Sequence, residues 1–239
     1  MNQARFDADV ARLATLAEPT RRALYLYVHA QGSPVSRDEA AAGVGVPRHR
    51  AKFHLDKLVD DGLLQAEFAR RTGRRGPGAG RPAKLYRRAA QDLAITLPGR
   101  RYELAGQLMA RGISEARSQE QPVTETLGRA AREHGRTLAA AALRQAGDGA
   151  SRPELLTAAR GVLDDEGYAT RADPAGLTLT NCPFRALAAE HTAVVCGGMN
   201  LAIMEGLLER LGRLRLTAVY EPGEGRCCVR LAAQVHNGA

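Results

Sequence analysis

A short turn containing two glycines separates two amphipathic segments near the start of the chain. Ser36 opens the first segment, and Glu39 follows it at the spacing of a capping box. Gly43 and Gly45 end that segment, and Pro47 stands where the first residue of the next helix is expected. Two short helices joined by a glycine turn predict a helix-turn-helix.

The segment after Pro47 has the apolar spacing of a helix that ends at Gly62. Its apolar residues recur on one face: Ala51, Leu55, Leu58 and Val59. Residues 7–30 show a similar pattern and predict two linked helices, the second starting at Pro19. Strand-like segments at 63–68 and 84–87 flank the sequence RRTGRRGPGAGRP, which predicts an exposed hairpin loop because it is rich in Gly and Pro.

The face opposite the apolar stripe predicts a surface that reads DNA. His49, Phe53 and Asp56 lie near its centre, and cationic residues flank them. A recognition helix inserts its N-terminal part into the major groove, where Arg and Lys donate to guanine and an apolar ring meets a thymine methyl group. The predicted base-reading residues are Arg48, His49, Arg50, Lys52 and Phe53.

Positive charge is concentrated in the same part of the chain. Residues 1–98 carry a net charge of +7, whereas residues 99–239 carry +1. The stretch from 70 to 88 holds eight cations and no acid, and a run of this kind is either a solubilising loop or a contact to a polyanion. Beside a helix-turn-helix we favour contacts to DNA phosphates or to the minor groove, made above all by Arg74, Arg75 and Arg81.

Three segments together resemble the winged-helix domain of the ArsR-like bacterial regulators: LATLAEPTRRALYLYV, RAKFHLDKLVDDGLL and GRPAKLYRR. The resemblance covers most of residues 10–90. It implies a winged helix-turn-helix that binds double-stranded DNA as a homodimer on an imperfect palindrome.

After residue 98 the pattern of the sequence changes. Helices are expected at 100–117, 123–145, 153–166 and 196–211, and short strands at 168–171, 177–181, 214–220 and 227–235. The predicted fold class is therefore α+β. An N-terminal winged helix-turn-helix domain (residues 1–98) precedes a C-terminal α+β sensor domain (residues 99–239) with a small antiparallel sheet.

All four cysteines, Cys182, Cys196, Cys227 and Cys228, lie in this second domain. Their spacing fits neither a zinc finger nor a zinc ribbon. Cys196 is expected near a helix N-terminus, where free N–H groups would favour a thiolate. On the final strand Cys227 shares a face with Val229, whereas Cys228 points the other way, so alternation predicts that only one of them joins a given site. The pattern leaves open which one, and a bend or bulge at Gly225 would change the answer.

The C-terminal pattern resembles the sensor half of the SufR-type iron-sulfur repressors. The resemblance rests on the cysteines in NCPF, VVCGGMN and RCCV, at about residues 180–230. It implies an iron-sulfur cluster, expected to be of the 4Fe–4S type, with the four cysteines as ligands. The fourth position is open between the vicinal pair, His191, an acid and an external ligand.

Three functions follow from these patterns. The first is a cytoplasmic DNA-binding transcriptional regulator, a repressor, that is controlled by the cluster and has no enzymatic activity. This class rests partly on the lack of a signal-peptide pattern and of a long apolar run, so no membrane partner is expected. The second keeps the regulator but gives it a small organic effector, with structural cysteines. The third is a thiol-dependent enzyme with Cys196 as nucleophile and His191 as base.

Overall fold

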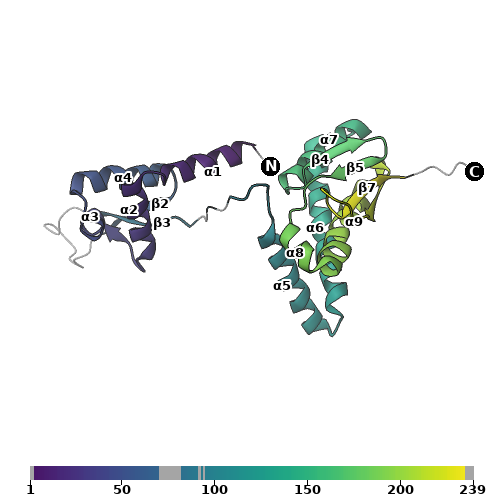
Figure 1. The fold of residues 1–239 in the computed structure, drawn as a ribbon, viewed down its shortest axis with the longest axis horizontal. Helices are drawn as coiled ribbons and strands as arrows, with labels where there is room; N and C mark the ends of the chain where they lie inside the picture. The colour runs from purple at the N-terminus through teal and green to yellow at the C-terminus, as the bar shows by residue number, and fades with distance from the viewer. Residues whose placement is uncertain (1–2, 70–81, 91–92, 94, 235–239) are drawn as a thin grey trace, which may run out of the picture. The chain divides into compact units, whose positions relative to one another are not determined.

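The computed structural model describes residues 3–69, 82–90, 93 and 95–234. Contacts between residues divide the chain into two compact units, Gln3–Ile95 and Thr96–Ala239 together with Met1–Asn2. Figure 1 shows the elements of each unit, which are described separately below. We call them the N-terminal unit and the C-terminal unit.

Four helices form most of the N-terminal unit: α1 (Gln3–Thr15), α2 (Pro19–Ala30), α3 (Arg37–Val44) and α4 (Arg48–Asp60). The two linked helices predicted before residue 30 are confirmed, as is the start of the second at Pro19. The helix-turn-helix consists of α3 and α4. The fold is α+β with a helix-turn-helix at its N-terminal end.

The caps of the helix-turn-helix follow from local sequence. Ser36 accepts a hydrogen bond from the backbone N–H of Glu39, whose carboxylate accepts from Ser36 in return, so the predicted capping box is present. Gly45 ends α3 with a φ of 72°, a left-handed conformation that glycine adopts without strain. Gly43 does not end the helix as predicted. It lies inside α3, where a Cβ would meet the Tyr27 ring at 2.0 Å.

A three-stranded antiparallel sheet completes the N-terminal unit. Its strands are β1 (Val35–Ser36), β2 (Leu64–Ala69) and β3 (Ala83–Arg88), in the order β1-β3-β2. The two predicted strands pair with each other, from Leu64 opposite Arg88 to Ala69 opposite Ala83. The core of the unit packs α2 and α4 against this hairpin through Leu24, Leu55, Leu58 and Tyr86.

The C-terminal unit is built on long helices. They are α5 (Tyr102–Gln119), α6 (Val123–Ala146), α7 (Arg152–Asp165), α8 (Arg185–Glu190) and α9 (Leu201–Arg210). A π-helical segment, η1 (Ala193–Asn200), runs directly into α9, and a 3-10 turn, η2 (Gly212–Leu214), follows it. The predicted helix at 196–211 is therefore present but begins earlier, at Ala193.

Two glycines allow α6 and α9 to pack closely. A Cβ on Gly135 would lie 2.0 Å from the carbonyl oxygen of Ile203, and a Cβ on Gly206 would lie 2.0 Å from that of Arg132. Side chains at these positions would force the helices apart. The contact is therefore backbone against backbone, and it fixes α9 and the segment that precedes it.

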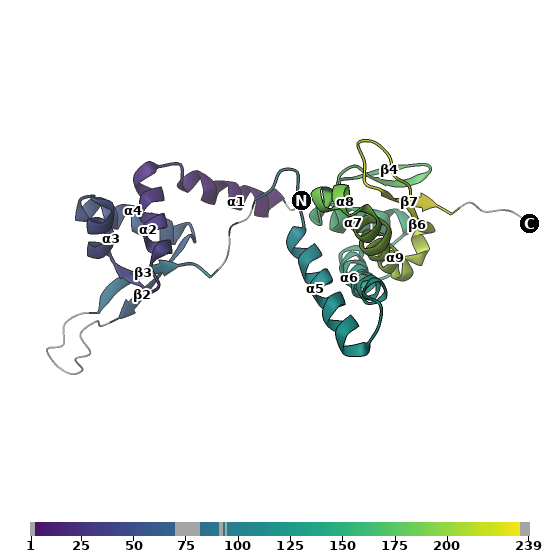
Figure 2. The same cartoon turned by 60° about the horizontal axis from the view of Figure 1, so that its bottom comes forward.

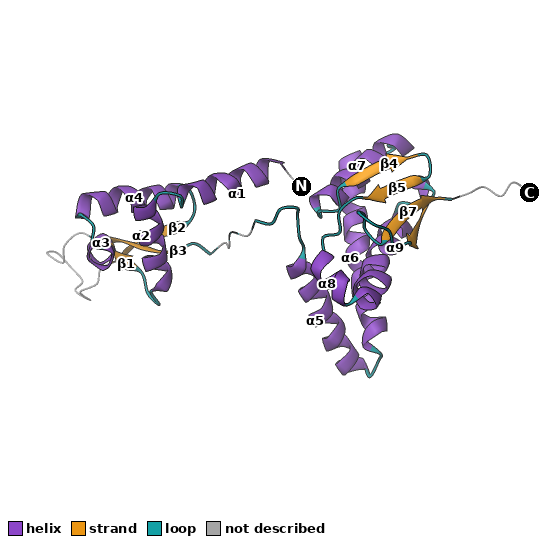
Figure 3. Cartoon of the chain, in the orientation of Figure 1, coloured by secondary structure: helices purple, strands orange, loops and turns teal. Residues whose placement is uncertain are grey.

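A four-stranded antiparallel sheet lies beside these helices, as Figures 2 and 3 show. Its strands are β4 (Thr170–Asp173), β5 (Gly176–Leu179), β6 (Leu216–Tyr220) and β7 (Val229–Ala233), in the order β4-β5-β7-β6. The small antiparallel sheet was predicted. The last strand, however, begins at Val229 rather than at residue 227, so both vicinal cysteines precede it.

Candidate DNA-binding surface and cysteine site

Helix α4 presents a polar face to solvent. Ala51, Leu55 and Leu58 are fully buried on its inner face. The residues predicted to read bases are all exposed: Arg48, His49, Arg50, Lys52 and Phe53. Donors and a ring on an exposed helix face suit contact with base edges in the major groove.

The cations on this face differ in how free they are. Arg48 forms an ion pair with Asp38 of α3. Arg50 and Lys52 form no ion pair with any residue that the structure describes. They therefore offer the least encumbered positive charge for a phosphate or a base acceptor.

Phe53 is the most exposed aromatic residue on α4, with 65% of its surface accessible. Its ring makes an edge contact with His54, at 5.2 Å between centroids. A groove of about 380 Å³ runs along this part of the helix and is lined by Phe53, Lys52 and Asp56, among others. An apolar ring beside cations fits contact with a thymine methyl group.

Asp56 ties the recognition helix to the strand hairpin. Its carboxylate accepts hydrogen bonds from Lys84 Nζ at 2.6 Å and from the Tyr86 hydroxyl at 2.9 Å, both on β3. Burial alone would raise the pKa of Asp56, but these two donors outweigh it and lower the pKa. The sequence placed Asp56 at the centre of the exposed face. The only sign in the sequence that Asp56 has a partner is that it is an acid surrounded by cations.

His54 is buried in α4 and was not singled out from the sequence. Its Nδ1 lies 3.6 Å from Glu18 Oε2 and accepts from Arg21 Nε at 3.4 Å. Glu18 also accepts hydrogen bonds from the backbone N–H groups of Thr20 and Arg21, and so caps α2. Burial lowers the pKa of His54 although Glu18 acts in the other direction. The contact joins the start of α2 to the middle of α4.

The predicted phosphate contacts Arg74, Arg75 and Arg81 lie outside the described residues. Two cations of the same basic stretch that the structure does describe are neutralised. Lys84 pairs with Asp56, and Arg87 Nε lies 3.4 Å from Glu67 Oε2. Arg74, Arg75 and Arg81 therefore remain a prediction from the sequence.

The four cysteines gather in the C-terminal unit although three segments supply them. Cys182 lies in the loop before α8, Cys196 lies in η1, and Cys227 and Cys228 lie just before β7. Cys182 and Cys227 lie close enough to shift each other's pKa, and Cys228 likewise shifts the pKa of Cys196. The site thus holds two pairs of neighbouring free thiols.

Each of the two vicinal cysteines lies near a different cysteine, so neither pair contains both of them. The prediction from alternation placed residues 227 and 228 in the strand, with a bend or bulge at Gly225 as the alternative. The two residues precede the strand, just after a turn at Gly225 with a φ of 68°. The turn places Cys227 near Cys182 and Cys228 near Cys196.

The thiols differ in acidity. The pKa of Cys182 is lowered to about 7, first by the hydrogen bond with Cys227 and then by the backbone N–H of Phe184 and by nearby arginines, while burial opposes the shift. The pKa of Cys227 is raised, first by Cys182 and then by burial. Within this pair Cys182 is therefore the more acidic thiol, and Cys227 is the one that stays protonated.

Cys196 contradicts the expectation of an activated thiolate. The helical segment begins at Ala193, so Cys196 is not at a free helix N-terminus. It is fully buried, and burial together with Cys228 raises its pKa to about 12. A buried thiol of this acidity lacks the thiolate that a nucleophile needs.

A buried polar network supports the cysteine pairs. Asn200 donates from Nδ2 to the sulfur of Cys227 at 3.2 Å and accepts from the Tyr168 hydroxyl at 2.7 Å. Asn200 is fully buried and Tyr168 is 2% exposed. Nothing in the sequence marked these two residues. Donors to sulfur in a dry surrounding are what tunes a thiolate-bound metal centre.

Two observations limit the kind of metal site. No three Cys, His, Asp or Glu side chains come close enough to hold a single metal ion in the part of the chain that the structure describes. His191, proposed as a further ligand or as a base, ends α8 and is exposed. The thiols are thus arranged as pairs and not as one compact set.

Comparison with known proteins supports the first of the two sites. A family model described as a helix-turn-helix domain matches residues 16–65, which include α2, α3 and α4. No curated protein and no solved structure matches the chain. The matched domain indicates DNA-binding transcriptional regulation and points to a regulator rather than to an enzyme.

Among the described residues, no helix combines the length and the apolar character that a membrane span requires.

Proposed function

We propose that this chain is a sequence-specific DNA-binding repressor whose affinity for DNA is controlled by an iron-sulfur cluster on Cys182, Cys196, Cys227 and Cys228. The observation that carries the proposal is the gathering of all four thiols in a unit separate from the helix-turn-helix. A polyanion-binding unit joined to a thiol site is the arrangement of a sensor.

The exposed half of α4 is the proposed base-reading element. Arg50 and Lys52 donate to guanine acceptors in the major groove, and Phe53 packs on thymine methyl groups. The arginines at 74, 75 and 81 add contacts to phosphates or to the minor groove. Asp56 holds the hairpin that carries them against α4.

The donor set suits a cluster better than a single ion. Each iron of a 4Fe–4S cluster takes one thiolate, so its protein ligands surround the cluster and do not converge on one point. The neighbouring pairs would separate when the cluster binds. Cys182 is already acidic, and Asn200 keeps a donor on the sulfur of Cys227. The cluster, when bound, would supply sensitivity to oxidants and to iron supply.

The proposed assembly is a homodimer on an imperfect palindrome in the cytoplasm. One helix-turn-helix reads only a few base pairs in a single major groove. Two copies related by a two-fold axis read two half-sites, and their separation is set by the dimer. A change in the C-terminal unit that alters this separation alters affinity without touching the base contacts.

The test is anaerobic isolation followed by a visible absorption spectrum and an assay of iron and acid-labile sulfide. We expect a brown protein that loses its colour in the double variant Cys182→Ser/Cys227→Ser. A colourless wild-type protein without iron or sulfide after reconstitution contradicts the cluster. Gel shifts with DNA from its own promoter region test DNA binding separately.

A second candidate is control by a small organic effector, with the cysteines as core residues. A groove of about 620 Å³ in the C-terminal unit favours it, within the size range of ligand pockets. Thr170, Thr180 and Asn181 supply polar groups there. Regulation that is unchanged in Cys182→Ser/Cys196→Ser would favour this candidate.

A further inference from the structure

We propose that Arg100 and Asn181 couple the cysteine site to the part of the chain that leads to the helix-turn-helix. The coupling deepens the proposed function, on which it rests for the cluster as the group that acts on Cys182. Two segments take part. The entry segment, residues 96–101, is the first part of the C-terminal unit after the N-terminal unit ends. The Cys182 loop, residues 180–184, lies between β5 and α8.

Side-chain hydrogen bonds join the two segments in both directions. Arg100 Nη1 donates to Asn181 Oδ1 at 2.7 Å and to the carbonyl oxygen of Cys182 at 3.2 Å. Asn181 Nδ2 donates in return to the carbonyl oxygen of Gly99 at 3.2 Å. Arg100 and Asn181 are both half-buried, which strengthens hydrogen bonds relative to those at an open surface. The entry segment is thus fastened to Cys182 itself and to the residue before it.

The backbone of the entry segment is equally close to its neighbours. The backbone N–H of Arg101 donates to the carbonyl oxygen of Pro183 at 3.0 Å. Gly167, which follows α7, has a φ of 89°, and a Cβ there would lie only 3.2 Å from the carbonyl oxygen of Gly99. Because main chain lies against main chain, a shift of the Cys182 loop displaces the entry segment as well.

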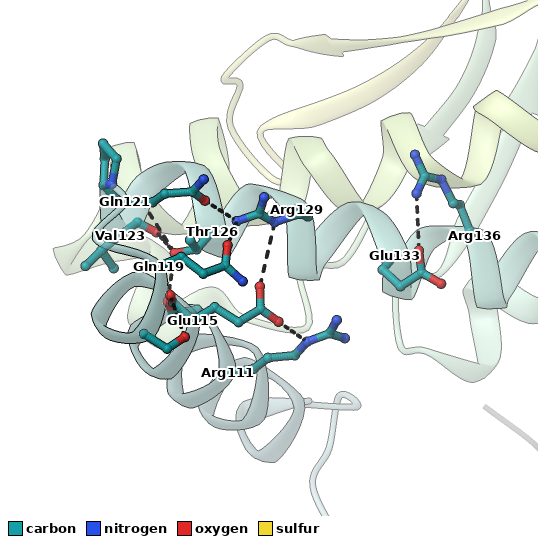
Figure 4. A network of polar contacts seen from close by, with 12 residues as sticks. Arg111, Glu115, Gln119, Gln121, Val123, Thr126, Arg129, Glu133 and Arg136 are labelled. Atoms are coloured by element: carbon teal, nitrogen blue, oxygen red, sulfur yellow. Dashed lines mark hydrogen bonds and ion pairs between the residues drawn. The ribbon is translucent and has the colours of Figure 1, made fainter.

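Arg100 differs from the arginines on the helix surfaces of the same unit. Figure 4 shows Arg111 and Arg129, which both reach the carboxylate of Glu115, at 2.7 Å and 3.7 Å. Exposed pairs of this kind contribute little to stability. Arg100 has no acidic partner in the part of the chain that the structure describes. Its guanidinium binds a backbone oxygen and an amide oxygen, so it follows the path of the loop.

The rest of the entry segment is held loosely or by a different element. Leu97 is 69% exposed and lines, with Pro98, the groove of about 620 Å³ noted above. The side chain of Arg101 donates to both carboxylate oxygens of Glu166, at 2.9 Å and 2.6 Å. Arg101 therefore ties the segment to the end of α7, whereas Arg100 ties it to the residue that carries a thiol.

The position of Cys182 makes its loop the transmitting element. In the cluster-free protein its thiol neighbours that of Cys227, which lies just before β7. When the sulfur of Cys182 binds a group that parts it from Cys227, the carbonyl oxygen of Cys182 and the side chain of Asn181 move with it. Arg100 carries that movement to the entry segment, so both ends of the path share one element.

The first measurement needs neither cluster nor DNA. Hydrogen exchange of the full, reduced, cluster-free chain is followed in residues 96–101 before and after alkylation with N-ethylmaleimide. The background is Cys228→Ser, which leaves Cys182 as the thiol that is not buried, and peptide masses identify the modified residue. We expect alkylation to speed exchange in the entry segment by at least about tenfold. In Arg100→Ala exchange is fast from the start, and alkylation changes it by less than about twofold.

The second measurement compares DNA affinity with and without the cluster. Arg100→Ala should take up iron and sulfide in wild-type amounts and bind DNA as the cluster-free wild type does. The ratio of its two dissociation constants should fall from at least about tenfold to below about twofold. Arg101→Ala is the matched control, because it removes the neighbouring arginine but leaves the bonds to the Cys182 loop, and it should keep both the ratio and the exchange response.

Circular dichroism checks that each variant is folded. Asn181→Ala, which removes the bond to Gly99, is the second variant with the same expected result. Arg100→Lys, which keeps a donor and the charge, should restore part of the response.

The coupling is overturned if Arg100→Ala keeps either the wild-type exchange response or the wild-type ratio of DNA affinities. Equal losses in Arg100→Ala and Arg101→Ala also overturn it, because any loosening of the entry segment would then suffice. A wild-type protein that never acquires iron contradicts the proposed function alone, since the exchange measurement then decides the coupling by itself.

Discussion

The two units place their candidate functional groups in opposite surroundings. In the N-terminal unit Arg50, Lys52 and Phe53 are exposed on one helix. In the C-terminal unit Cys196 is 0% and Cys227 is 1% exposed, and three separate segments supply the thiols. Exposed cations suit a large polyanion that approaches from outside. Buried thiols suit a small group that is protected from water.

The units also hold these groups in place differently. The N-terminal unit uses hydrogen bonds beside its exposed helix face, from Lys84 and Tyr86 to the carboxylate of Asp56. The C-terminal unit uses close backbone contact at Gly135 and Gly206 and a buried bond from Asn200 to sulfur. Because each site is held by contacts within its own unit, either site can be disabled without the other, which the following variants exploit.

The largest expected effect is on the cysteine site. Cys182→Ser/Cys227→Ser removes one pair of neighbouring thiols. We expect complete loss of bound iron and sulfide after anaerobic reconstitution, measured chemically and by absorption. The cluster-free variant should bind DNA as the cluster-free wild type does. If these two cluster-free proteins differ in DNA affinity, the cysteine site cannot be disabled without affecting the DNA-binding site.

A second variant tests the backbone contact between α6 and α9. Gly135→Ala should lower the free energy of unfolding of the C-terminal unit by roughly 2–4 kcal/mol, because its Cβ would collide with the carbonyl of Ile203. Gly128→Ala on the same helix meets nothing within 4 Å and should raise stability by up to about 1 kcal/mol. Urea unfolding measures both. Equal effects of the two substitutions would refute the packing argument.

The third variant concerns free positive charge on α4. Arg50→Ala/Lys52→Ala should lower the slope of log affinity against log salt concentration by about 2, since each cation that enters the groove between the phosphates displaces about one counterion from the DNA. Lys57 is the control, because Asp61 holds its Nζ at 2.8 Å. Lys57→Ala should change the slope less. Fluorescence anisotropy at several salt concentrations gives both values.

The smallest expected effect concerns the tie at Asp56. Its pKa is lowered in the folded state, so its stabilising contribution is present above the ordinary Asp pKa and is lost as the pH falls through the lower, folded pKa. Asp56→Asn should reduce stability by about 1 kcal/mol at neutral pH and flatten the decline toward acid.

Asp60, exposed on the same helix, is the matched site for this test. Thermal melts of Asp56→Asn and Asp60→Asn from neutral to acid pH compare the two. A variant at Asp56 that follows the pH dependence of the wild type would show that the hydrogen bonds to Lys84 and Tyr86 do not stabilise the unit.

Features that depend on residues close together in the sequence could be predicted. The Ser36–Glu39 capping box and the left-handed turn at Gly45 are set by neighbouring residues, so the helix-turn-helix could be predicted. The spacing of Leu55 and Leu58 likewise predicted the buried face of α4.

Features that depend on contacts between residues far apart in the sequence could not be predicted. Asp56 meets Tyr86 only because the hairpin folds back on α4, and Cys196 lies near Cys228 only because η1 packs beside the start of β7. The early start of the helix at Ala193 escaped notice because no side-chain cap marks it. His54 was missed because a polar residue within the buried face breaks the apolar pattern.

The most direct test of the account measures the affinity of one protein preparation for its own promoter DNA before and after its cluster is removed anaerobically. Fluorescence anisotropy at fixed salt concentration and pH gives the two dissociation constants. We expect a brown protein whose affinity for DNA changes at least about tenfold when the iron is removed. A protein that binds this DNA equally well in both states, or that never acquires iron and sulfide, contradicts this expectation.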